Sequence, residues 1–440
     1  MPEIRPFRAL RYDPATVPDP SLVVAPPYDV ISPAEHDRLL ARHPANVVRL
    51  DLPRDEAGDE PDDRYRRAAR TLAAWRSDGT LHKDPHPSIY VYEQAYRVPG
   101  AEASRIQRGF FARMCLESFG AGSGVLPHER TMSGPKEDRY KLLRATGVNT
   151  SPVIVLYTDR DGAGRVVLDA MTARAADLDL IDDDGVRHRL WAFPADGEAA
   201  EAVAPLLAAA SSGPVTIADG HHRYETALRY RDERRMSRSC EEDPAFDYLL
   251  ALFLDTVGEP LTVLPTHRIL RGLGDGGVDA LLAGLDAFFV VERDVTETEL
   301  RQRFEAAGLA PGGEGRFGLW TRAGGAFLTA RRHAFELYLP AGGEALRALD
   351  VTLLGVALER LAGIDDDAVT AGAVAYARSA AEAIAQVDAG IDGADAAFLL
   401  EPTPVASVAA VAADGDVMPQ KSTYFYPKAL SGLVINPHEW

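Results

Sequence analysis

The sequence predicts an α/β protein with a mixed sheet and more than one domain. Strand-like and helix-like patterns alternate along the chain, and residues 215–234 combine a buried strand with a helix that follows it directly. The length of 440 residues corresponds to two or three units, at about 150 residues per domain. Hydrophobic residues make up 46% and charged residues 26% of the chain, which excludes wholesale disorder and fibrous repeats.

Residues 1–104 are expected to form a first α/β segment that packs on the core. A helix should begin after Ser32, because serine is a good N-cap and Pro33 is tolerated in the first helical turn. Residues 64–75 have helical periodicity, and residues 89–96 alternate like a strand. This first part is therefore mixed α/β from its start.

Residues 105–271 are expected to form the second unit. Strand patterns at 107–116 and 151–157 flank a helix pattern at 136–145, which should end at Gly147. This order of elements continues the mixed α/β pattern.

The second half of this unit contains the sharpest local signal of the chain. Residues 160–213 are acidic, rich in alanine and helical in part. A buried strand at 215–218 then turns into a helix at 221–234. A pair of apolar strands is expected to follow at 248–254 and 261–264.

Residues 272–440 are expected to form an additional α/β domain, because the composition changes to stretches rich in glycine and alanine. The expected strands and helices are 287–291, 316–319 and 335–339 as strands, and 345–361 and 373–387 as helices. The composition of residues 418–428 is too specific for a loose tail.

Charge and cysteine content narrow the class of partner. The 47 basic and 66 acidic residues give a net charge of −19, which argues against nucleic acid or an anionic membrane as a partner and favours small ligands. Cys115 and Cys240 are far apart without CxxC spacing, so neither a disulfide framework nor a thiolate metal site is expected. No signal peptide and no apolar run of about 20 residues is visible. We therefore expect a cytoplasmic protein.

The turn formed by Asp219, Gly220, His221, His222 and Arg223 is the strongest candidate for a binding site. A helix N-terminus exposes unpaired N–H groups and the positive end of a dipole, so this turn is suited to phosphate oxygens. Arg223 adds a guanidinium that forms charge-assisted hydrogen bonds. The alternative is an ordinary capped helix whose polar first turn is solvated.

A metal site made by protein side chains alone is not expected. His221 and His222 diverge by about 100° on a helix and cannot easily share one ion. His128 and Glu129 begin like a zinc-protease helix, but Met132 stands where the second histidine is needed. Glu129 remains a candidate general base next to a phosphate site, with a surface carboxylate at a helix start as the alternative.

Two further phosphate motifs are rejected. Residues 272–277 match GxGxxG, but the helix that should follow is short, and we interpret the segment as a flexible loop. Lys421, Ser422 and Thr423 resemble the end of a P-loop, yet Gln420 replaces the required glycine. The lysines of this segment can still contact an anion.

The turn at 219–223 and the helix after it resemble the ParB/sulfiredoxin-like superfamily, and most closely its free-serine kinase branch. In that branch an equivalent turn binds nucleotide phosphates, and a Pro-His-Glu segment supplies the base. Pro127, His128 and Glu129 match that segment, which implies that Glu129 is the base. The distance from Pro152 to Asp219 is longer than in compact relatives, so residues 160–213 are expected to be an insertion in a ParB/sulfiredoxin-like nucleotide-binding core.

Over nearly its whole length the chain is identified as a member of a large uncharacterised bacterial family, domain-of-unknown-function family 1015. Members of this family resemble neighbours of serine-biosynthesis enzymes in bacterial operons, which agrees with a kinase. The matching segments are 5–7, 25–30, 46–50, 108–110, 128–131, 138–139, 151–152, 218–223, 265–268 and 421–428.

These resemblances imply a nucleotide-dependent kinase that phosphorylates the hydroxyl of a small polar metabolite, with free L-serine as the first candidate. The nucleotide would be ATP or ADP, or CTP, with Mg²⁺. The expected catalytic residues are Glu129 and His222, the expected phosphate-binding residues are Asp219, Gly220, His221, His222, Arg223 and Thr226, and the expected substrate-binding residues are Asn46, Arg49, His128, Lys136, Arg139, His267, Arg268 and Lys421. The main alternative is a nucleotide-binding switch without phosphorylation of a metabolite, and a scaffolding protein is a third. A homodimer is left open.

Overall fold

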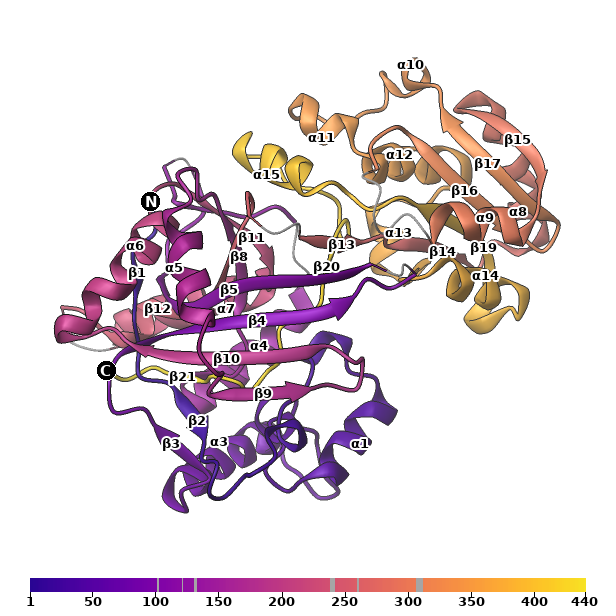
Figure 1. Ribbon diagram of the computed structural model, residues 1–440. Helices are drawn as coiled ribbons and strands as arrows, with labels where there is room; N and C mark the ends of the chain where they lie inside the picture. The colour runs from indigo at the N-terminus through magenta and orange to yellow at the C-terminus, as the bar shows by residue number, and fades with distance from the viewer. Residues whose placement is uncertain (101–102, 121, 130–132, 238–241, 259–260, 306–311) are drawn as a thin grey trace.

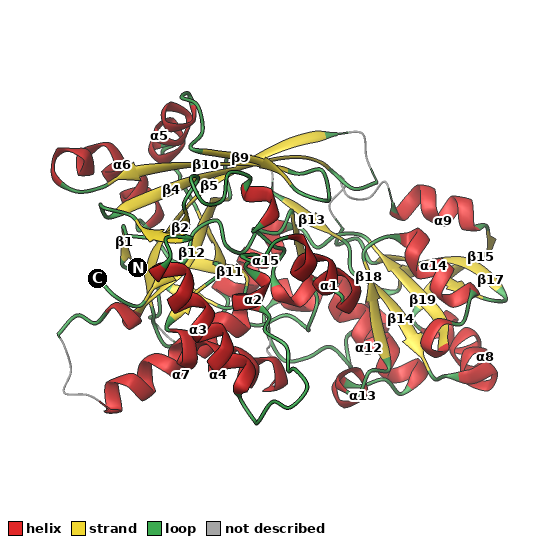
Figure 2. Ribbon diagram, turned by 90° about the horizontal axis from the view of Figure 1, so that it is seen from below, coloured by secondary structure: helices red, strands yellow, loops and turns green. Residues whose placement is uncertain are grey.

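Two sheets organise the protein, and each is the centre of its own layered unit (Figure 1). The computed structural model describes the whole chain except residues 101–102, 121, 130–132, 238–241, 259–260 and 306–311. Both chain ends lie in the larger unit, and the two units lie side by side when seen from below (Figure 2). The fold class is mixed α/β with a mixed sheet, which confirms the prediction.

The larger unit is built on a mixed sheet of nine strands within the described residues. In spatial order the strands are β6 (Val125–Leu126), β11 (Val215–Asp219), β8 (Val153–Tyr157), β12 (Tyr248–Asp255), β5 (Ser104–Cys115), β4 (Ser88–Arg97), β10 (Arg187–Pro194) and β9 (Leu178–Ile181), with β1 (Ile4–Arg5) beside β5. The pairs β6–β11 and β8–β12 are parallel, and the other neighbours are antiparallel. β9 and β10 come from residues 160–213, which the sequence predicted to be helical in part and for which no strand was predicted.

Both faces of this sheet are buried, which explains why β8 and β12 are apolar throughout. Along β12, Leu249 and Phe253 point into one core while Leu250 and Leu252 point into the other, as strand geometry requires. Residues 425–434 from the C-terminal end cover the second face. The helices that cover the first face are α4 (Ser133–Thr146), α5 (Ala163–Thr172), α6 (Ala200–Ala210) and α7 (His221–Ser237).

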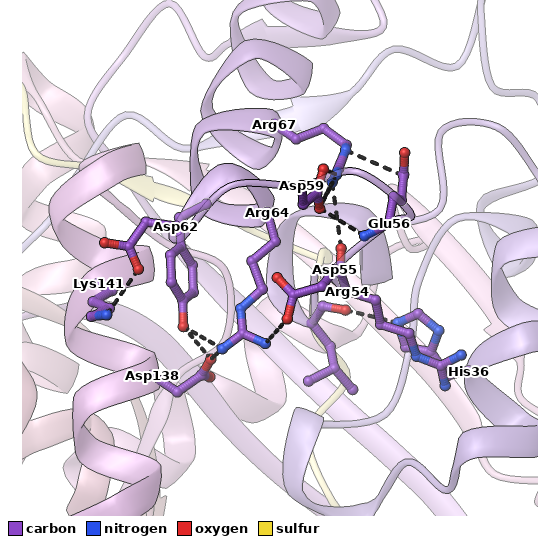
Figure 3. Close-up of polar contacts among 12 residues, drawn as sticks. His36, Arg54, Asp55, Glu56, Asp59, Asp62, Arg64, Arg67, Asp138 and Lys141 are labelled. Atoms are coloured by element: carbon purple, nitrogen blue, oxygen red, sulfur yellow. Dashed lines mark hydrogen bonds and ion pairs between the residues drawn. The ribbon is translucent and has the colours of Figure 1, made fainter.

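The N-terminal helices are α1 (Pro33–Arg42), α2 (Val48–Asp51) and α3 (Asp63–Ser77), and they lie between β2 (Leu10–Tyr12) and β3 (Leu81–Lys83), which pair antiparallel. Ser32 caps α1 as predicted, because its hydroxyl accepts a hydrogen bond from the Glu35 N–H at 3.2 Å. Figure 3 shows how α3 is tied to α4: the Asp138 carboxylate accepts hydrogen bonds from Arg64 at 3.0 Å and from Tyr65 at 2.7 Å.

The smaller unit has an antiparallel sheet with helices on both faces. Its strands, in spatial order, are β15 (Phe289–Val295), β17 (Gly324–Ala330), β16 (Arg316–Thr321), β19 (Ala394–Leu400), β14 (His267–Arg271) and β18 (Val374–Ala377). Its helices are α8 (Gly274–Gly284), α9 (Glu297–Phe304), α10 (Arg332–Phe335), α11 (Glu344–Ala348), α12 (Asp350–Ala362), α13 (Asp366–Thr370), α14 (Ala380–Asp388) and α15 (Val405–Ala413).

The chain then returns to the larger unit through residues 418–440. β20 (Tyr424–Tyr426) pairs with β13 (Thr262–Leu264), and β21 (Asn436–Pro437) pairs with β7 (Val148–Asn149). The C-terminal end of the chain is therefore built into the first core. The division into 1–104, 105–271 and 272–440 stays a prediction.

Several predictions of local structure in the smaller unit are wrong. A strand at 335–339 would place Phe335 and Leu337 on one face, but Phe335 is buried at the end of α10 and Leu337 is 91% exposed. The helix predicted at 373–387 starts only at 380, because Ser379 caps it and the residues before it form β18.

The segment 272–277 is not a flexible loop, because α8 begins at Gly274. The Asp395 carboxylate accepts hydrogen bonds from the Leu273 N–H at 2.8 Å and the Gly274 N–H at 3.1 Å, which satisfies amides at the helix start. The strands predicted at 248–254 and 261–264 both exist but do not pair with each other, since β12 lies in the large sheet and β13 pairs with β20.

Across the ranges that the structure describes, we find no helix that is both long and apolar enough to cross a membrane.

Candidate functional site

A solvent-open cavity lies where the two units and the C-terminal segment meet, close to β13 and β20 in Figure 1. The cavity has a volume of about 230 Å³. Its lining comes from five places: the short helical turn Tyr28–Val30, the segment at Glu129, the turn between β11 and α7, the smaller unit, and the C-terminal segment. The lining residues are Tyr28, Asp29, Val30, Glu129, Ala218, Asp219, Gly220, His221, His222, Arg223, Thr266, Tyr376, Arg378, Lys421, Thr423, Tyr424 and Lys428.

The turn between β11 and α7 has the geometry that the sequence predicts. β11 is buried up to Ala218, and Gly220 has a φ of +92°, a conformation that favours glycine. A Cβ atom at Gly220 would lie 2.9 Å from Nε and 3.0 Å from Cζ of Arg223. The glycine therefore lets the Arg223 guanidinium fold back over the turn, at the N-terminal end of a 17-residue helix.

Asp219 is held between two cations. Its carboxylate accepts a hydrogen bond from Arg223 Nη2 at 2.5 Å and forms an ion pair with Lys428 Nζ. Burial by itself would raise the pKa of Asp219, but Lys428 and Arg223 hold this pKa well below its ordinary value. The carboxylate is therefore ionised, and the three side chains together carry one positive charge.

In the described part of the chain, the Nε–H of Arg223 has no partner. Its Nη1 donates to the Pro152 carbonyl, its Nη2 donates to Asp219, and its buried Nε has no hydrogen-bond partner among the described residues. A buried N–H without a partner is costly, and this donor lies beside Gly220.

Glu129 lines the same cavity as the turn. Its Oε1 accepts a hydrogen bond from the backbone N–H of Lys421 at 2.8 Å. Burial raises the pKa of Glu129 above its ordinary value, although Lys421 opposes this shift. A carboxyl group with a raised pKa is a better proton acceptor than an ordinary surface carboxylate.

Two buried histidines fix these parts to one another. His128 forms one hydrogen bond through Nδ1 with the Ile217 carbonyl and another through Nε2 with the Thr423 hydroxyl at 3.1 Å. Its backbone N–H donates to Nε2 of His221 at 3.2 Å. Burial lowers the pKa of His128 to about 4 and the pKa of His221 well below its ordinary value, so both rings are neutral. These rings join the 128 segment, β11 and the C-terminal segment.

The structure brings seven of the fifteen predicted site residues to one cavity. Those that line it are Glu129, Asp219, Gly220, His221, His222, Arg223 and Lys421. His128 lies directly behind this lining. Arg268 lies behind it too, because its guanidinium donates to the Thr266 carbonyl at 2.7 Å and the Lys421 carbonyl at 3.0 Å. Burial lowers the pKa of His222.

Four predicted substrate residues are not brought to the cavity. The Asn46 amide donates to the Leu22 and Val24 carbonyls and accepts from the Val48 N–H. Arg49 donates to the Leu40 carbonyl, and Lys136 pairs with Glu225 at 2.5 Å. His267 is fully buried at the start of β14 in the smaller sheet, where its Nδ1 accepts from the Leu400 N–H at 3.1 Å.

Thr226 and Arg139 line a smaller crevice on the other side of Arg223. Arg139 donates to Asp138 and to the Asp51 carbonyl, and its guanidinium lies 4.1 Å from the centre of the Tyr28 ring. The Thr226 hydroxyl is buried and has no partner among the described residues.

Several residues of the cavity were missed by the sequence. They are Tyr28, Asp29, Tyr376, Arg378, Tyr424 and Lys428. Tyr28, Asp29 and Lys428 lie in segments that carry the family resemblance, so their sequence signal was present without an assigned role. Tyr376 lies in β18 and Arg378 follows it, and only the position of the smaller sheet brings them to the site.

The charged residues of the lining favour an anion. Four are basic (Arg223, Arg378, Lys421 and Lys428) and three are acidic (Asp29, Glu129 and Asp219), so the lining has an excess of one positive charge in a chain of net charge −19. Among the side chains that the structure describes, no three of His, Cys, Asp or Glu come together as metal ligands. Arg130, Thr131, Met132 and Cys240, on which sequence arguments were based, lie outside the described residues.

Comparison with solved structures finds distant similarities. A conserved hypothetical protein from Pyrococcus furiosus is 15% identical, with 69% of this chain and 87% of that chain covered and a TM-score of 0.34. A free serine kinase in complex with AMP is 14% identical, with 75% and 90% covered and a TM-score of 0.36. SbnI from Staphylococcus aureus, with a C-terminal truncation, is 10% identical, with 70% and 82% covered and a TM-score of 0.35. At such values these similarities say nothing about the activity of this chain.

Comparison with curated proteins finds no match. The sequence does match one protein family, described as "Protein of unknown function (DUF1015)", over residues 4–352. The matched range contains the turn at 219–223 and Glu129, whereas Tyr376, Lys421 and Lys428 lie beyond it. Because the match spans most of the sequence, the chain belongs to this family, as the sequence analysis predicted.

Proposed function

We propose that the cavity binds the phosphates of a nucleotide and transfers a phosphoryl group to the hydroxyl of a small polar metabolite, with free L-serine as the first candidate. The observation that carries the proposal is that Glu129 and the turn at Asp219 and Gly220 line one cavity. A phosphoryl transfer needs an anion site and a proton acceptor beside each other. The resemblance of both motifs to the free-serine kinase branch supports the same conclusion.

The turn suits a phosphate group in three respects. The N–H groups of the first turn of α7 have no partners within the helix, Gly220 places no side chain of its own over the turn, and the Arg223 guanidinium lies against it. Arg223 and Lys428 supply positive charge at the same place. Phosphoryl transfer depends mainly on such positioning and charge neutralisation.

Mg²⁺ would be held mainly by the nucleotide. Mg²⁺ in phosphate sites keeps several waters and takes one or two carboxylates together with phosphate oxygens. The carboxylates of Asp219 and Asp29 line the cavity and could supply these ligands. When bound, the ion would neutralise charge on the transferring group.

Glu129 is assigned as the general base. The acceptor hydroxyl oxygen would bond to the terminal phosphorus, the bond from that phosphorus to the bridging oxygen would break, and the hydroxyl proton would pass to Glu129. The nucleotide leaves with one phosphate fewer. Lys421 holds the Glu129 carboxylate through its backbone N–H, which keeps one oxygen oriented.

Phosphorus NMR tests this proposal directly. The full chain is incubated with Mg²⁺, L-serine and ATP, ADP or CTP in turn, and a new phosphomonoester resonance that depends on serine is expected. The signal should be lost in Glu129→Gln and kept in Glu137→Gln, because Glu137 is a surface residue paired with Arg229. A serine-dependent ester that Glu129→Gln still forms at the full rate would contradict the role of Glu129.

The alternative is a nucleotide-dependent switch. It is favoured by one observation, namely that the cavity is lined by both units and by the C-terminal segment, so that a bound nucleotide would contact all three. The same NMR sample separates the two functions. Nucleotide that binds but remains intact, together with a change in the radius of gyration by small-angle scattering, would favour the switch.

A further inference from the structure

The C-terminal segment is fastened across the cavity at several points. The Met418 N–H donates to the His128 carbonyl at 2.8 Å, and the Lys421 N–H donates to Glu129 at 2.8 Å. Further along, β20 pairs with β13, and the Gln94 side chain donates to the Lys428 carbonyl at 3.0 Å. The position of Lys428 is thereby fixed by contacts on both sides of it.

The Lys428 side chain ends inside the cavity. It is only 11% exposed, it is paired with Asp219, and its Nζ lies 4.5 Å from the centre of the Tyr424 ring. Burial by itself would lower the pKa of Lys428, but Asp219 and Asp29 raise it, so the ammonium stays charged. An ammonium has three N–H donors, and the ion pair with Asp219 is its one hydrogen bond within the described residues.

We propose that Lys428 binds the phosphate chain of the nucleotide, and that its ion pair with Asp219 is the resting arrangement of an ammonium that the bound phosphate then shares. The inference rests on the proposed function in one respect, that the ligand is a nucleotide. Lys428 lies 209 residues from Asp219 in the sequence and beyond the matched family range of 4–352. The structure therefore assigns part of the anion site to a segment outside that range.

The other cations of the lining are less suited to this role. Lys421 is exposed, and it is the backbone of this residue that contacts Glu129. Arg378 is exposed, and its guanidinium lies 4.2 Å from the Tyr424 ring centre. Lys428 combines burial, charge and a direct contact with Asp219 at the phosphate turn.

Isothermal titration with ADP tests the proposal. Lys428→Ala should weaken ADP binding by about 10- to 100-fold, the usual effect of losing a hydrogen bond to a charged group, while adenosine binding changes little. The matched control is Lys141→Ala, since Lys141 pairs with Asp62 at 2.8 Å on the surface of the larger unit (Figure 3). Unchanged ADP affinity in a folded Lys428→Ala protein would overturn the proposal.

A second pair of variants covers the case in which Lys428→Ala leaves Asp219 under-compensated and unfolds the protein. Without Mg²⁺, Asp219→Asn should bind ADP more tightly than the wild type, because both cations are released from the carboxylate. Adding Lys428→Met should remove that gain and lower affinity at least 10-fold relative to Asp219→Asn. Equal affinities of the single and double variants would contradict the proposal.

Whether the protein transfers a phosphoryl group is a separate question from whether Lys428 binds the nucleotide. Binding of ADP that depends on Lys428, without any phosphomonoester in the NMR assay, would support this inference and count against the kinase. If the wild-type chain binds neither ADP nor inorganic pyrophosphate, both the inference and the proposed function are wrong.

Discussion

Replacing Gly220 by alanine tests the phosphate turn with a single methyl group. Gly220 has a φ of +92°, and the left-handed region costs an L-residue about 1–2 kcal/mol. The added Cβ would also lie 2.9 Å from Nε and 3.0 Å from Cζ and Nη2 of Arg223. Real Cβ atoms essentially never come so close to another heavy atom, so the guanidinium has to shift by a few tenths of an ångström away from the turn.

Two effects of Gly220→Ala are therefore expected. The free energy of unfolding should fall by about 1–2 kcal/mol from backbone strain. The displaced guanidinium and the added methyl group should weaken phosphate binding by up to one hydrogen bond to a charged group, about 1.5–3 kcal/mol, which corresponds to about 10- to 100-fold weaker nucleotide binding. Titration calorimetry with ADP measures the second effect, and urea denaturation measures the first.

Gly185→Ala is the matched control. Gly185 has a φ of +76° and no atom within 4 Å of its hypothetical Cβ. It lies in the turn between β9 and β10, away from the cavity lining. The control should show a similar loss of stability with unchanged ADP affinity. If both alanine variants bind ADP equally well, the turn is not the phosphate site and the reasoning is refuted.

Three further predictions concern protonation. Glu129→Gln should lower kcat by about 10²- to 10⁴-fold with nucleotide affinity kept, and a parallel loss of nucleotide binding would count against its role as base. Because burial raises the pKa of Glu129, kcat/KM should fall as the pH decreases through a value above the ordinary 4.5; a profile that stays flat down to pH 4.5 would contradict this. His128 and His267 are neutral in the fold, with pKa values of about 4 and about 3, but take up protons near 6.5 when unfolded. Stability should therefore be fully present above pH 6.5 and decrease below it by up to about 1.4 kcal/mol per histidine per pH unit, and urea denaturation of His267→Gln should show a shallower decrease than the wild type.

The sequence predicts the centre of the larger unit well because its signals are local. β8, β11 and β12 are short apolar runs bounded by turn residues, and such runs are typical of strands buried on both faces. Ser32 before Pro33 and Glu35 is a capping pattern that can be read without tertiary contacts. In these places propensity, periodicity and burial agree.

The smaller unit is predicted less well because its elements depend on distant partners. β17 and β19 have the sequences GGAFLTA and ADAAFLL, which are poor in β-branched residues. They become strands because neighbouring strands supply their hydrogen bonds. α8 begins at a glycine because Asp395, more than a hundred residues later, satisfies its first amides.

The sequence predicts only the part of the candidate site that local motifs form. The turn at Asp219 and Gly220 and the proposed base Glu129 are visible as local motifs, whereas Arg378 and Lys428 reach the cavity only because the chain crosses to the smaller unit and returns. Asn46 shows the opposite error. It belongs to a matching segment, but its amide is used to hold backbone groups of the 22–24 segment.

The ion pairs of Asp219 explain how such a site can exist before a ligand arrives. Arg223 and Lys428 are both buried, and a buried charge without a partner costs about 3–5 kcal/mol. Asp219 supplies that partner and so allows two cationic side chains to be held at the start of the helix. The same carboxylate repels a phosphate group, and that repulsion is relieved when a divalent cation lies between them. An aspartate in the proposed phosphate turn is therefore consistent with a nucleotide that binds together with its metal ion. If the nucleotide binds in this way, the tighter ADP binding expected of Asp219→Asn should disappear when Mg²⁺ is present.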